Sequence, residues 1–356
     1  MKTTPPSCPP DPKRLFALDL LRVLACFLVI WQHVIEPYYA YPDLTIVRNA
    51  DTPIVGWINS LTPIEVPLFV MISGYFLLPL REETGTFFRK RFTRVLFPFI
   101  CWCAVYAVYY VFQRGDTWQE CLIHICQIPV NFGTEIGHLW FVYMLLGLYL
   151  LVPVLSPWLQ QCSQKQLRAY LVLWGFTTCL PYIHLFFPQI LGECFWNPTP
   201  MLHYFTGFVG YFLLGYYIRR YGALSVRTSL IMLVTGYLVT VCIYQYRLPR
   251  VSSMSDLEVC WRFCGINIAI MAYAVFSLVS RIRYAIGHFI TRFSLLSYAI
   301  YLSHMIFINL YRELLEDTLG RVYYQVPVIT LCSFLTSFII VWLLSYLPKA
   351  KYWLGS

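Results

Sequence analysis

Four ionisable residues share one face of the first apolar segment, residues 15–36. Arg22 and His33 are eleven positions apart, and eleven steps of 100° return a helix almost to the same face, roughly 16 Å further along its axis. Asp19 and Glu36 fall on that side too. An ionisable side chain inside a membrane helix is costly unless it faces the bundle interior or a water-filled cavity. This stripe is therefore our default candidate for the functional site.

The residue types in the stripe predict proton transfer at one of its ends. Imidazole takes up and releases protons near neutral pH, so His33 is suited to act as a general base. Glu36 follows about one helical turn later, where its carboxylate is expected to orient the imidazole and stabilise its cation. At the other end of the stripe, Arg22 is expected to pair with Asp19.

A dense basic cluster follows the second apolar segment, within residues 88–98. Arg91 and Arg94 are three positions apart and share one face if a helix begins here. The guanidinium group binds phosphate through a planar fork of donors. Basic residues in loops also anchor membrane proteins on the cytoplasmic side. From composition alone, an anchor and a phosphate site explain the cluster equally well.

The second apolar segment, residues 57–79, carries four residues of interest. Pro67 removes a backbone hydrogen bond, which predicts a kink. Close packing of helices through small residues explains Ser73 and Gly74 without a ligand. Glu65 lies near the outer end of the segment, where it can face water or contact a substrate.

Two further histidines lie in apolar segments. His138 and Trp140 open the fourth segment at the outer boundary, where an interfacial tryptophan is common and a histidine can be solvated. His304 lies roughly 18 Å from the inner end of the ninth segment, so it either hydrogen-bonds to another helix or belongs to the functional site. Three polar residues in the eighth and ninth segments are weaker candidates of the same kind: Arg262, Asn267 and Asn309.

The composition is that of a polytopic membrane protein built from helices. Of 356 residues, 59% are hydrophobic and only 12% are charged, too few to solvate the exterior of a soluble domain of this size. Apolar runs of about 20 residues, each long enough to cross a hydrocarbon core of about 30 Å, recur along the chain. We predict an all-α bundle of about ten transmembrane helices, near residues 15–36, 57–79, 95–113, 138–155, 169–187, 204–219, 229–246, 260–280, 292–311 and 326–347.

This arrangement predicts one membrane domain over residues 15–348, with a disordered tail at 1–14 and a C-terminal tail at 349–356. Eighteen Lys and Arg residues fall in the tails and the even-numbered loops, against six on the opposite side. Because basic residues concentrate on the cytoplasmic side, both termini are predicted to be cytoplasmic. The net charge of +9 is thus a topology signal, and no nucleic-acid partner is expected.

The thirteen cysteines do not predict a metal site. Most lie within apolar segments, where cysteine behaves as a small hydrophobe, and no His or carboxylate cluster at ligand spacing accompanies them. Cys121, Cys126 and Cys194 fall on the outer side, and the sequence leaves open whether a disulfide joins two of them.

Taken together, four motifs resemble the acyltransferase 3 family of integral-membrane acyltransferases, over about residues 15–347. The family has an Arg, ten residues and a His in its first helix. It then has a Pro-x-Phe-x-x-x-Ser-Gly-aromatic stretch, an Arg-x-x-Arg loop and a Ser-Tyr-x-x-Tyr-Leu-x-His stretch. The matching residues are, in order, Arg22 and His33, Pro67 to Tyr75, Arg91 and Arg94, and Ser297 to His304. Within the family, residues 138–141 and 149–155 are similar to the branch of the enterobacterial common antigen O-acetyltransferase.

The resemblance implies a multi-pass enzyme of the bacterial inner membrane whose donor is acetyl-CoA or another acyl-CoA bound from the cytoplasm. The CoA phosphates are expected at the basic cluster, and the pantetheine arm is expected to pass along the first helix. The donor-binding residues would be Arg22, Asp19, Ser73, Arg91 and Arg94.

The same resemblance implies O-acyl transfer to a hydroxyl of an envelope glycan or a lipid-linked sugar. His33 would be the general base and Glu36 its partner. The acceptor would be contacted by Glu65, His138, Trp140 and His304.

Two other functional classes stay open at this point. Charges inside the membrane also mark the pathways of transporters, although the apolar segments show no obvious repeated halves. Some relatives of the family are non-catalytic, ligand-binding membrane modules.

Overall fold

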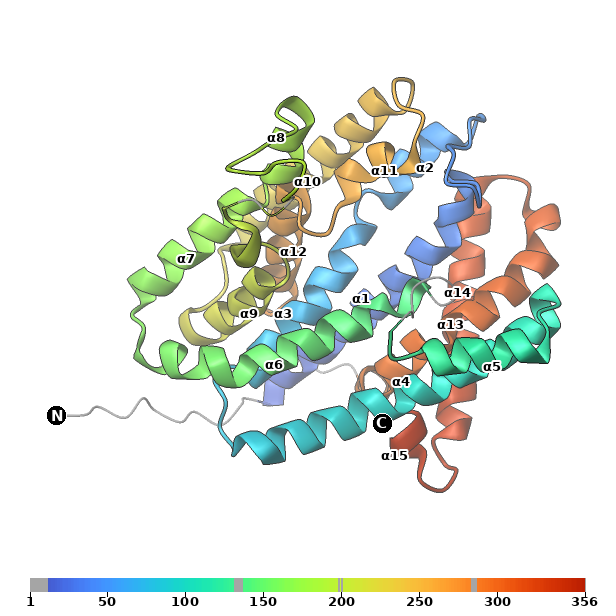
Figure 1. Ribbon diagram of the computed structural model, residues 1–356, viewed down its shortest axis with the longest axis horizontal. Helices are drawn as coiled ribbons and strands as arrows, with labels where there is room; N and C mark the ends of the chain where they lie inside the picture. The colour runs from blue at the N-terminus through green and yellow to red at the C-terminus, as the bar shows by residue number, and fades with distance from the viewer. Residues whose placement is uncertain (1–11, 131–136, 198, 200, 283–286, 356) are drawn as a thin grey trace.

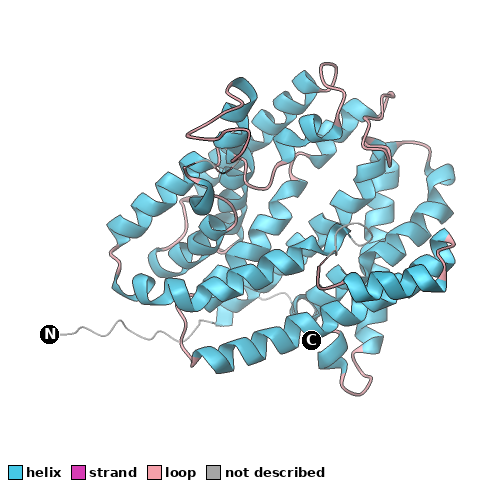
Figure 2. Cartoon of the chain, in the orientation of Figure 1, coloured by secondary structure: helices cyan, strands magenta, loops and turns pink. Residues whose placement is uncertain are grey.

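The computed structural model describes residues 12–130, 137–197, 199, 201–282 and 287–355 (Figure 1). Within these ranges the chain forms helices and isolated β-bridges but no strand, as Figure 2 shows. Nine helical segments of the described residues are long and apolar enough to cross a membrane. The predicted all-α, polytopic bundle is thereby confirmed.

The α-helices are α1 (Pro12–Ile35), α2 (Thr52–Asn59), α3 (Glu65–Leu77), α4 (Thr84–Arg114), α5 (Trp118–Gln127), α6 (Trp140–Gln161), α7 (Gln164–Thr177), α8 (Leu180–Phe186), α9 (Val209–Tyr221), α10 (Val226–Arg247), α11 (Met254–Leu257), α12 (Ile266–Val279), α13 (Gly287–Leu319), α14 (Val322–Leu344) and α15 (Ala350–Trp353). The short 3₁₀ helices are η1 (Glu36–Tyr38), η2 (Thr62–Ile64), η3 (Gly137–Leu139), η4 (His203–Phe205) and η5 (Glu258–Trp261).

The sixth predicted span, residues 204–219, differs from the other nine. It corresponds to α9, whose 13 residues are fewer than the roughly 20 that a hydrocarbon core requires. Gly207, with a φ of 83°, separates η4 from α9. Residues 210–216 are all buried, and α9 packs against α3. Protein surrounds this short helix, so its length need not match the bilayer.

The second span is interrupted, but not where the sequence predicts. α2 ends at Asn59, and the chain passes through η2 before α3 begins at Glu65. Pro67 lies in the first turn of α3, where a missing N–H breaks no bond within the helix. The predicted kink at Pro67 is therefore wrong, and Pro63 lies within the actual interruption.

The basic cluster is helical, and the prediction that it lies in a loop is wrong. α4 begins well before the predicted third span because Glu83 caps it, accepting from the backbone N–H of Thr86 at 3.3 Å. Arg91 and Arg94 therefore lie about one turn apart on a 31-residue helix.

At the N-terminus, α1 begins at Pro12. The end of the predicted tail, residues 12–14, is therefore helical, and residues 1–11 lie outside the described ranges.

At the other end of the chain, the predicted C-terminal tail is docked on the bundle. It contains α15, which packs against α4. The indole N–H of Trp102 donates to the carbonyl of Trp353 at 3.1 Å, and Leu354 is fully buried.

The helix that carries the ionisable stripe is enclosed by three others. Figure 1 shows α1 between α3 on one side and α13 and α14 on the other, and α1 packs against all three. Leu21, Ala25, Ile30 and Val34 on α1 have no exposed surface. The ionisable side chains of α1 therefore meet protein groups from neighbouring helices.

Candidate functional site

Three histidines from distant parts of the chain meet at one end of α1. His33 lies in the last turn of α1, His138 in η3 and His304 in α13. The ring centroid of His33 is 6.0 Å from that of His138 and 5.2 Å from that of His304, and the last two are 5.2 Å apart. His138 is 9% exposed and His304 is fully buried. His138 is therefore not solvated at the membrane boundary. His304 lies next to His33, the candidate base.

Backbone and side-chain contacts fix the orientation of this histidine cluster. Nδ1 of His33 lies 3.7 Å from a carboxylate oxygen of Glu36, the first residue of η1. Nδ1 of His304 lies 2.6 Å from the carbonyl oxygen of Tyr301. The hydroxyl of Tyr301 donates to the carbonyl of His138, also at 2.6 Å. Tyr301 thus holds two of the three histidines in place.

Arg312 also supports the cluster, although its position in the sequence does not mark it as a site residue. Its guanidinium donates to the carbonyl oxygens of His33 at 3.3 Å and of Val34 at 3.0 Å. These are orphan carbonyls at the C-terminal end of α1, where a positive charge is favourable. The ninth span predicted from the sequence ends at residue 311, which places Arg312 in a loop. In the structure α13 continues to Leu319.

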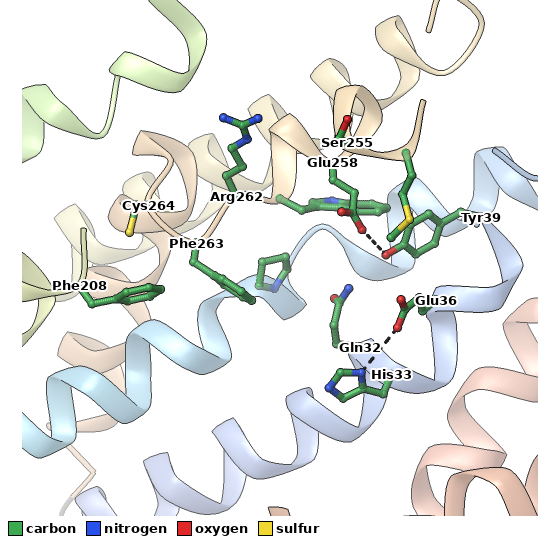
Figure 3. A pocket seen from close by; sticks show the side chains of 13 residues that line it. Gln32, His33, Glu36, Tyr39, Phe208, Ser255, Glu258, Arg262, Phe263 and Cys264 are labelled. Atoms are coloured by element: carbon green, nitrogen blue, oxygen red, sulfur yellow. Dashed lines mark hydrogen bonds and ion pairs between the residues drawn. The ribbon is translucent and has the colours of Figure 1, made fainter. Parts of the chain in front are cut away.

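A cavity of about 520 Å³ opens beside His33. Figure 3 shows Gln32, His33 and Glu36 along one wall, with Glu258 and Arg262 across from them. Four aromatic side chains complete much of its lining: Tyr39, Phe208, Trp261 and Phe263. The cavity therefore combines carboxylates with aromatic faces next to the candidate base.

The hydroxyl of Tyr39 is protonated in one of the polar contacts that line this cavity. The hydroxyl of Tyr39 donates to a carboxylate oxygen of Glu258 at 2.7 Å. Burial, and then the negative charge of Glu258, raises the pKa of Tyr39 well above its usual range. Tyr39 therefore keeps its proton and holds Glu258 in place. Neither residue carries a sequence signal that would have marked it, because the sequence does not show which loop residues reach the cavity.

The opposite end of the stripe is an ion pair extended by a serine. Arg22 lies 3.4 Å from Asp19, as the spacing predicts. Ser294 of α13 donates to the same carboxylate oxygen at 2.6 Å and lies 3.4 Å from the Arg22 guanidinium. That guanidinium also lies over the ring of Phe76, 5.0 Å from its centroid.

The basic cluster on α4 lies within electrostatic range of this ion pair. The charges of Arg91 and Arg94 interact electrostatically with Arg22 of α1 and with the hydroxyl of Tyr149 of α6. Neither has an ion-pair partner among the described residues, and Nε of Arg91 is buried without a hydrogen bond. The positive charges of Arg91 and Arg94 thus lie near Arg22, which is paired with Asp19. Such an arrangement favours a bound anion.

Three residues predicted for the site have other surroundings in the structure. The hydroxyl of Ser73 donates to the carbonyl of Phe69 within its own helix, at 2.9 Å. Glu65 is 2% exposed, so it does not face water, and it is absent from the cavity lining. Trp140 lies behind the cavity wall, stacked on Phe263 with ring centroids 5.5 Å apart.

The weaker polar candidates divide in the same way. Arg262 lines the cavity. Asn267 joins neighbouring segments, because its amide donates to the Thr240 hydroxyl and to the Cys260 carbonyl, both at 2.7 Å. Asn309 donates to the hydroxyl of Tyr109 at 3.3 Å.

Within the described part of the chain, no group of three or more His, Cys, Asp or Glu side chains is arranged to hold a metal ion. Cys121, Cys126 and Cys194 are free thiols in the structure. The sequence leaves open whether a disulfide joins two of them, and the structure has none between these three cysteines.

Comparison with known proteins agrees with the motifs. The sequence profile of the acyltransferase 3 family, which describes an acyltransferase domain, matches residues 15–346. No curated protein and no solved structure gives a significant match, so the similarity to the enterobacterial branch stays a prediction. The profile spans nearly the whole chain and includes both ends of the stripe on α1. The protein therefore belongs to the acyltransferase 3 family of integral-membrane acyltransferases.

Proposed function

We propose that this membrane acyltransferase moves an acetyl or similar short acyl group from acyl-CoA to a hydroxyl of an envelope glycan or a lipid-linked sugar. The proposal depends on one observation: the two ends of α1 carry different chemical groups. Arg22 and the α4 arginines lie at one end, and His33 and its cavity lie at the other, roughly 16 Å away. This distance is comparable to the pantetheine arm of CoA, so one donor molecule can reach from the basic end to the base.

The basic end is suited to the phosphates of CoA. Arg91 and Arg94 have no carboxylate partner in the part of the chain that the structure describes. Each can offer a forked pair of donors to a phosphate oxygen. Asp19 and Ser294 hold Arg22 between this cluster and the rest of α1. In the proposed orientation, this end of the bundle faces the cytoplasm and receives the donor from there.

The cavity is suited to a sugar acceptor. Carboxylates at Glu36 and Glu258 accept hydrogen bonds from hydroxyl groups, and the aromatic faces of Trp261 and Phe263 offer flat apolar contact to a pyranose ring. Trp140 contributes indirectly by stacking on Phe263. No contact joins Glu65 to the cavity, so its role in acceptor binding stays a sequence prediction.

The proposed reaction is direct transfer. The acceptor oxygen attacks the thioester carbonyl carbon while its proton passes to His33, whose imidazolium is stabilised by Glu36. The tetrahedral intermediate then collapses, the C–S bond breaks, and the CoA sulfur receives the proton from His33. The products are an ester and free CoA. No acyl-histidine intermediate is needed. Membership of an acyltransferase family favours this scheme over a transporter or a ligand-binding module.

The donor site is tested by binding of CoA to the purified protein. Replacing both Arg91 and Arg94 by Gln is expected to weaken CoA binding by about 10-fold or more for each arginine, because a charge-assisted hydrogen bond to phosphate is lost at each position. The measurement is the shift of the unfolding temperature across a CoA titration.

The matched control is the pair Arg89→Gln and Lys90→Gln on the same helix. It removes the same charge from the same helix, but the charges that affect Arg22 are those of Arg91 and Arg94, and Lys90 pairs with Glu82. This control is expected to bind CoA like the parent. Equal losses in both double variants would show that CoA responds only to the general positive charge of α4. Parental CoA binding by the Arg91→Gln and Arg94→Gln variant would show that the cluster acts only as a membrane anchor. Absence of any protection of the parent by CoA would contradict the proposed donor.

A further inference from the structure

Two buried nitrogens of the histidine cluster have no partner among the residues that the structure describes. Nε2 of His138 and Nε2 of His304 make no hydrogen bond to any described residue, although both side chains are at least nine-tenths buried. An unsatisfied polar atom in such a place is costly. The ring centroids lie 5.2 Å to 6.0 Å apart, so a polar group that reaches either nitrogen lies close to His33.

The protonation of two of the rings follows from their neighbours. A carbonyl oxygen only accepts hydrogen bonds, so Nδ1 of His304, 2.6 Å from the Tyr301 carbonyl, carries the proton. Nε2 of neutral His304 is therefore a lone-pair acceptor. The carboxylate of Glu36 likewise favours the proton on Nδ1 of His33, at 3.7 Å, and leaves Nε2 of His33 as an acceptor.

His138 supplies the complementary group. No side-chain hydrogen bond to the described residues fixes its tautomer, and its backbone is held by Tyr301. His138 packs against both of these rings. A proton on Nε2 of His138 places a donor beside the two acceptor rings, whereas a lone pair there would add a third acceptor to the cluster. The cluster then presents two acceptors and one donor.

We propose that Nε2–H of His138 is the oxyanion donor of the acyl transfer, an inference that rests on the function proposed above. When the acceptor oxygen bonds to the thioester carbon and its proton passes to His33, the carbonyl electron pair moves to the carbonyl oxygen. His138 donates a hydrogen bond to that oxygen. Collapse restores the C=O bond, breaks the C–S bond and returns the proton from His33 to the CoA sulfur. His138 is neutral before and after the step.

The test compares His138→Gln with His138→Met, two unbranched side chains of similar volume of which only the first has an N–H. Purified protein in lipid nanodiscs is given acetyl-CoA with methyl glucoside as the acceptor probe, and CoA thiol release is followed. His138→Met is expected to lower kcat by about 10²- to 10³-fold, the usual effect of losing one oxyanion donor. His138→Gln is expected to keep at least about 10-fold more activity than His138→Met. The KM for acetyl-CoA is expected to stay within about threefold, because the donor acts on the transition state.

The control is His184→Met, which removes an exposed histidine paired with Glu193 at 3.5 Å, outside the cluster. It is expected to keep parental activity. A His138→Met protein that does not keep the parental unfolding temperature is replaced by His138→Leu, which also lacks a donor.

Equal activity of the Gln and Met variants would overturn the assignment, whether both match the parent or both lose the same factor. If His33→Ala is inactive while His138→Met stays within threefold of the parent, the oxyanion assignment fails and the proposed function stands. If the parent neither releases thiol nor gains stability from acetyl-CoA, the proposed function fails and this inference fails with it.

Discussion

His33→Ala is expected to lower acyl transfer by about 10²- to 10⁴-fold, the range that a positioned general base contributes. Without the imidazole, the acceptor hydroxyl must lose its proton to water or to Glu36, which is 46% exposed. The measurement is CoA thiol release from acetyl-CoA by the purified variant. CoA should still raise the unfolding temperature as in the parent, because the basic cluster lies at the other end of α1.

Two controls separate loss of the base from loss of structure. His184→Ala removes an exposed histidine and should leave turnover unchanged. Glu36→Gln keeps the size of the side chain but removes its charge. It should reduce turnover less than His33→Ala does, because the imidazole that accepts the proton is still present. Turnover of His33→Ala within threefold of the parent would contradict the assignment of the base.

Gly74→Ala and Gly215→Ala are each expected to destabilise the protein by about 3 kcal/mol or more, because overpacking against backbone cannot be relieved by rotamer changes. A Cβ at Gly74 would lie 1.8 Å from the carbonyl oxygen of Phe212 on α9, and one at Gly215 would lie 1.9 Å from that of Met71 on α3. The two helices approach through small residues on both sides. The measurement is the unfolding temperature in detergent.

The matched control is Gly147→Ala on α6, where nothing lies within 4 Å of the added Cβ. It is expected to be neutral or to stabilise by up to about 1 kcal/mol, because alanine favours the helix more than glycine does. Parental stability of Gly74→Ala would show that α3 and α9 are not in this close contact. Because α1 packs against α3, separation of α3 from α9 should also reduce acyl transfer.

The fold class and the placement of Arg22 and His33 on one helix could both be predicted from the sequence. Apolar runs long enough for a bilayer require helices, because a backbone in lipid must satisfy its own hydrogen bonds. Helical periodicity is local, so the spacing of Arg22 and His33 was enough to place both on one face, and the i, i+3 spacing gave the pair of Arg22 with Asp19. The motif order gave the family, which the profile over residues 15–346 confirms.

Local periodicity failed where neighbouring helices decide the outcome. α9 is shorter than its apolar pattern suggests, because buried packing on α3 replaces contact with lipid. The break near Pro63, in place of a kink at Pro67, depends on where α3 begins. The docking of α15 on α4 depends on a partner far along the chain.

Only the tertiary structure assembled the histidine cluster. His33, His138 and His304 come from α1, η3 and α13. Their meeting depends on how η3 and α13 are placed beside the end of α1, which spacing along the chain does not encode. The same holds for two other residues of α13. Arg312 donates to backbone carbonyls at the end of α1, and Tyr301 donates to the backbone carbonyl of His138 in η3. Sequence specifies which side chains a helix presents on each face, whereas the partners of that face are set by long-range packing.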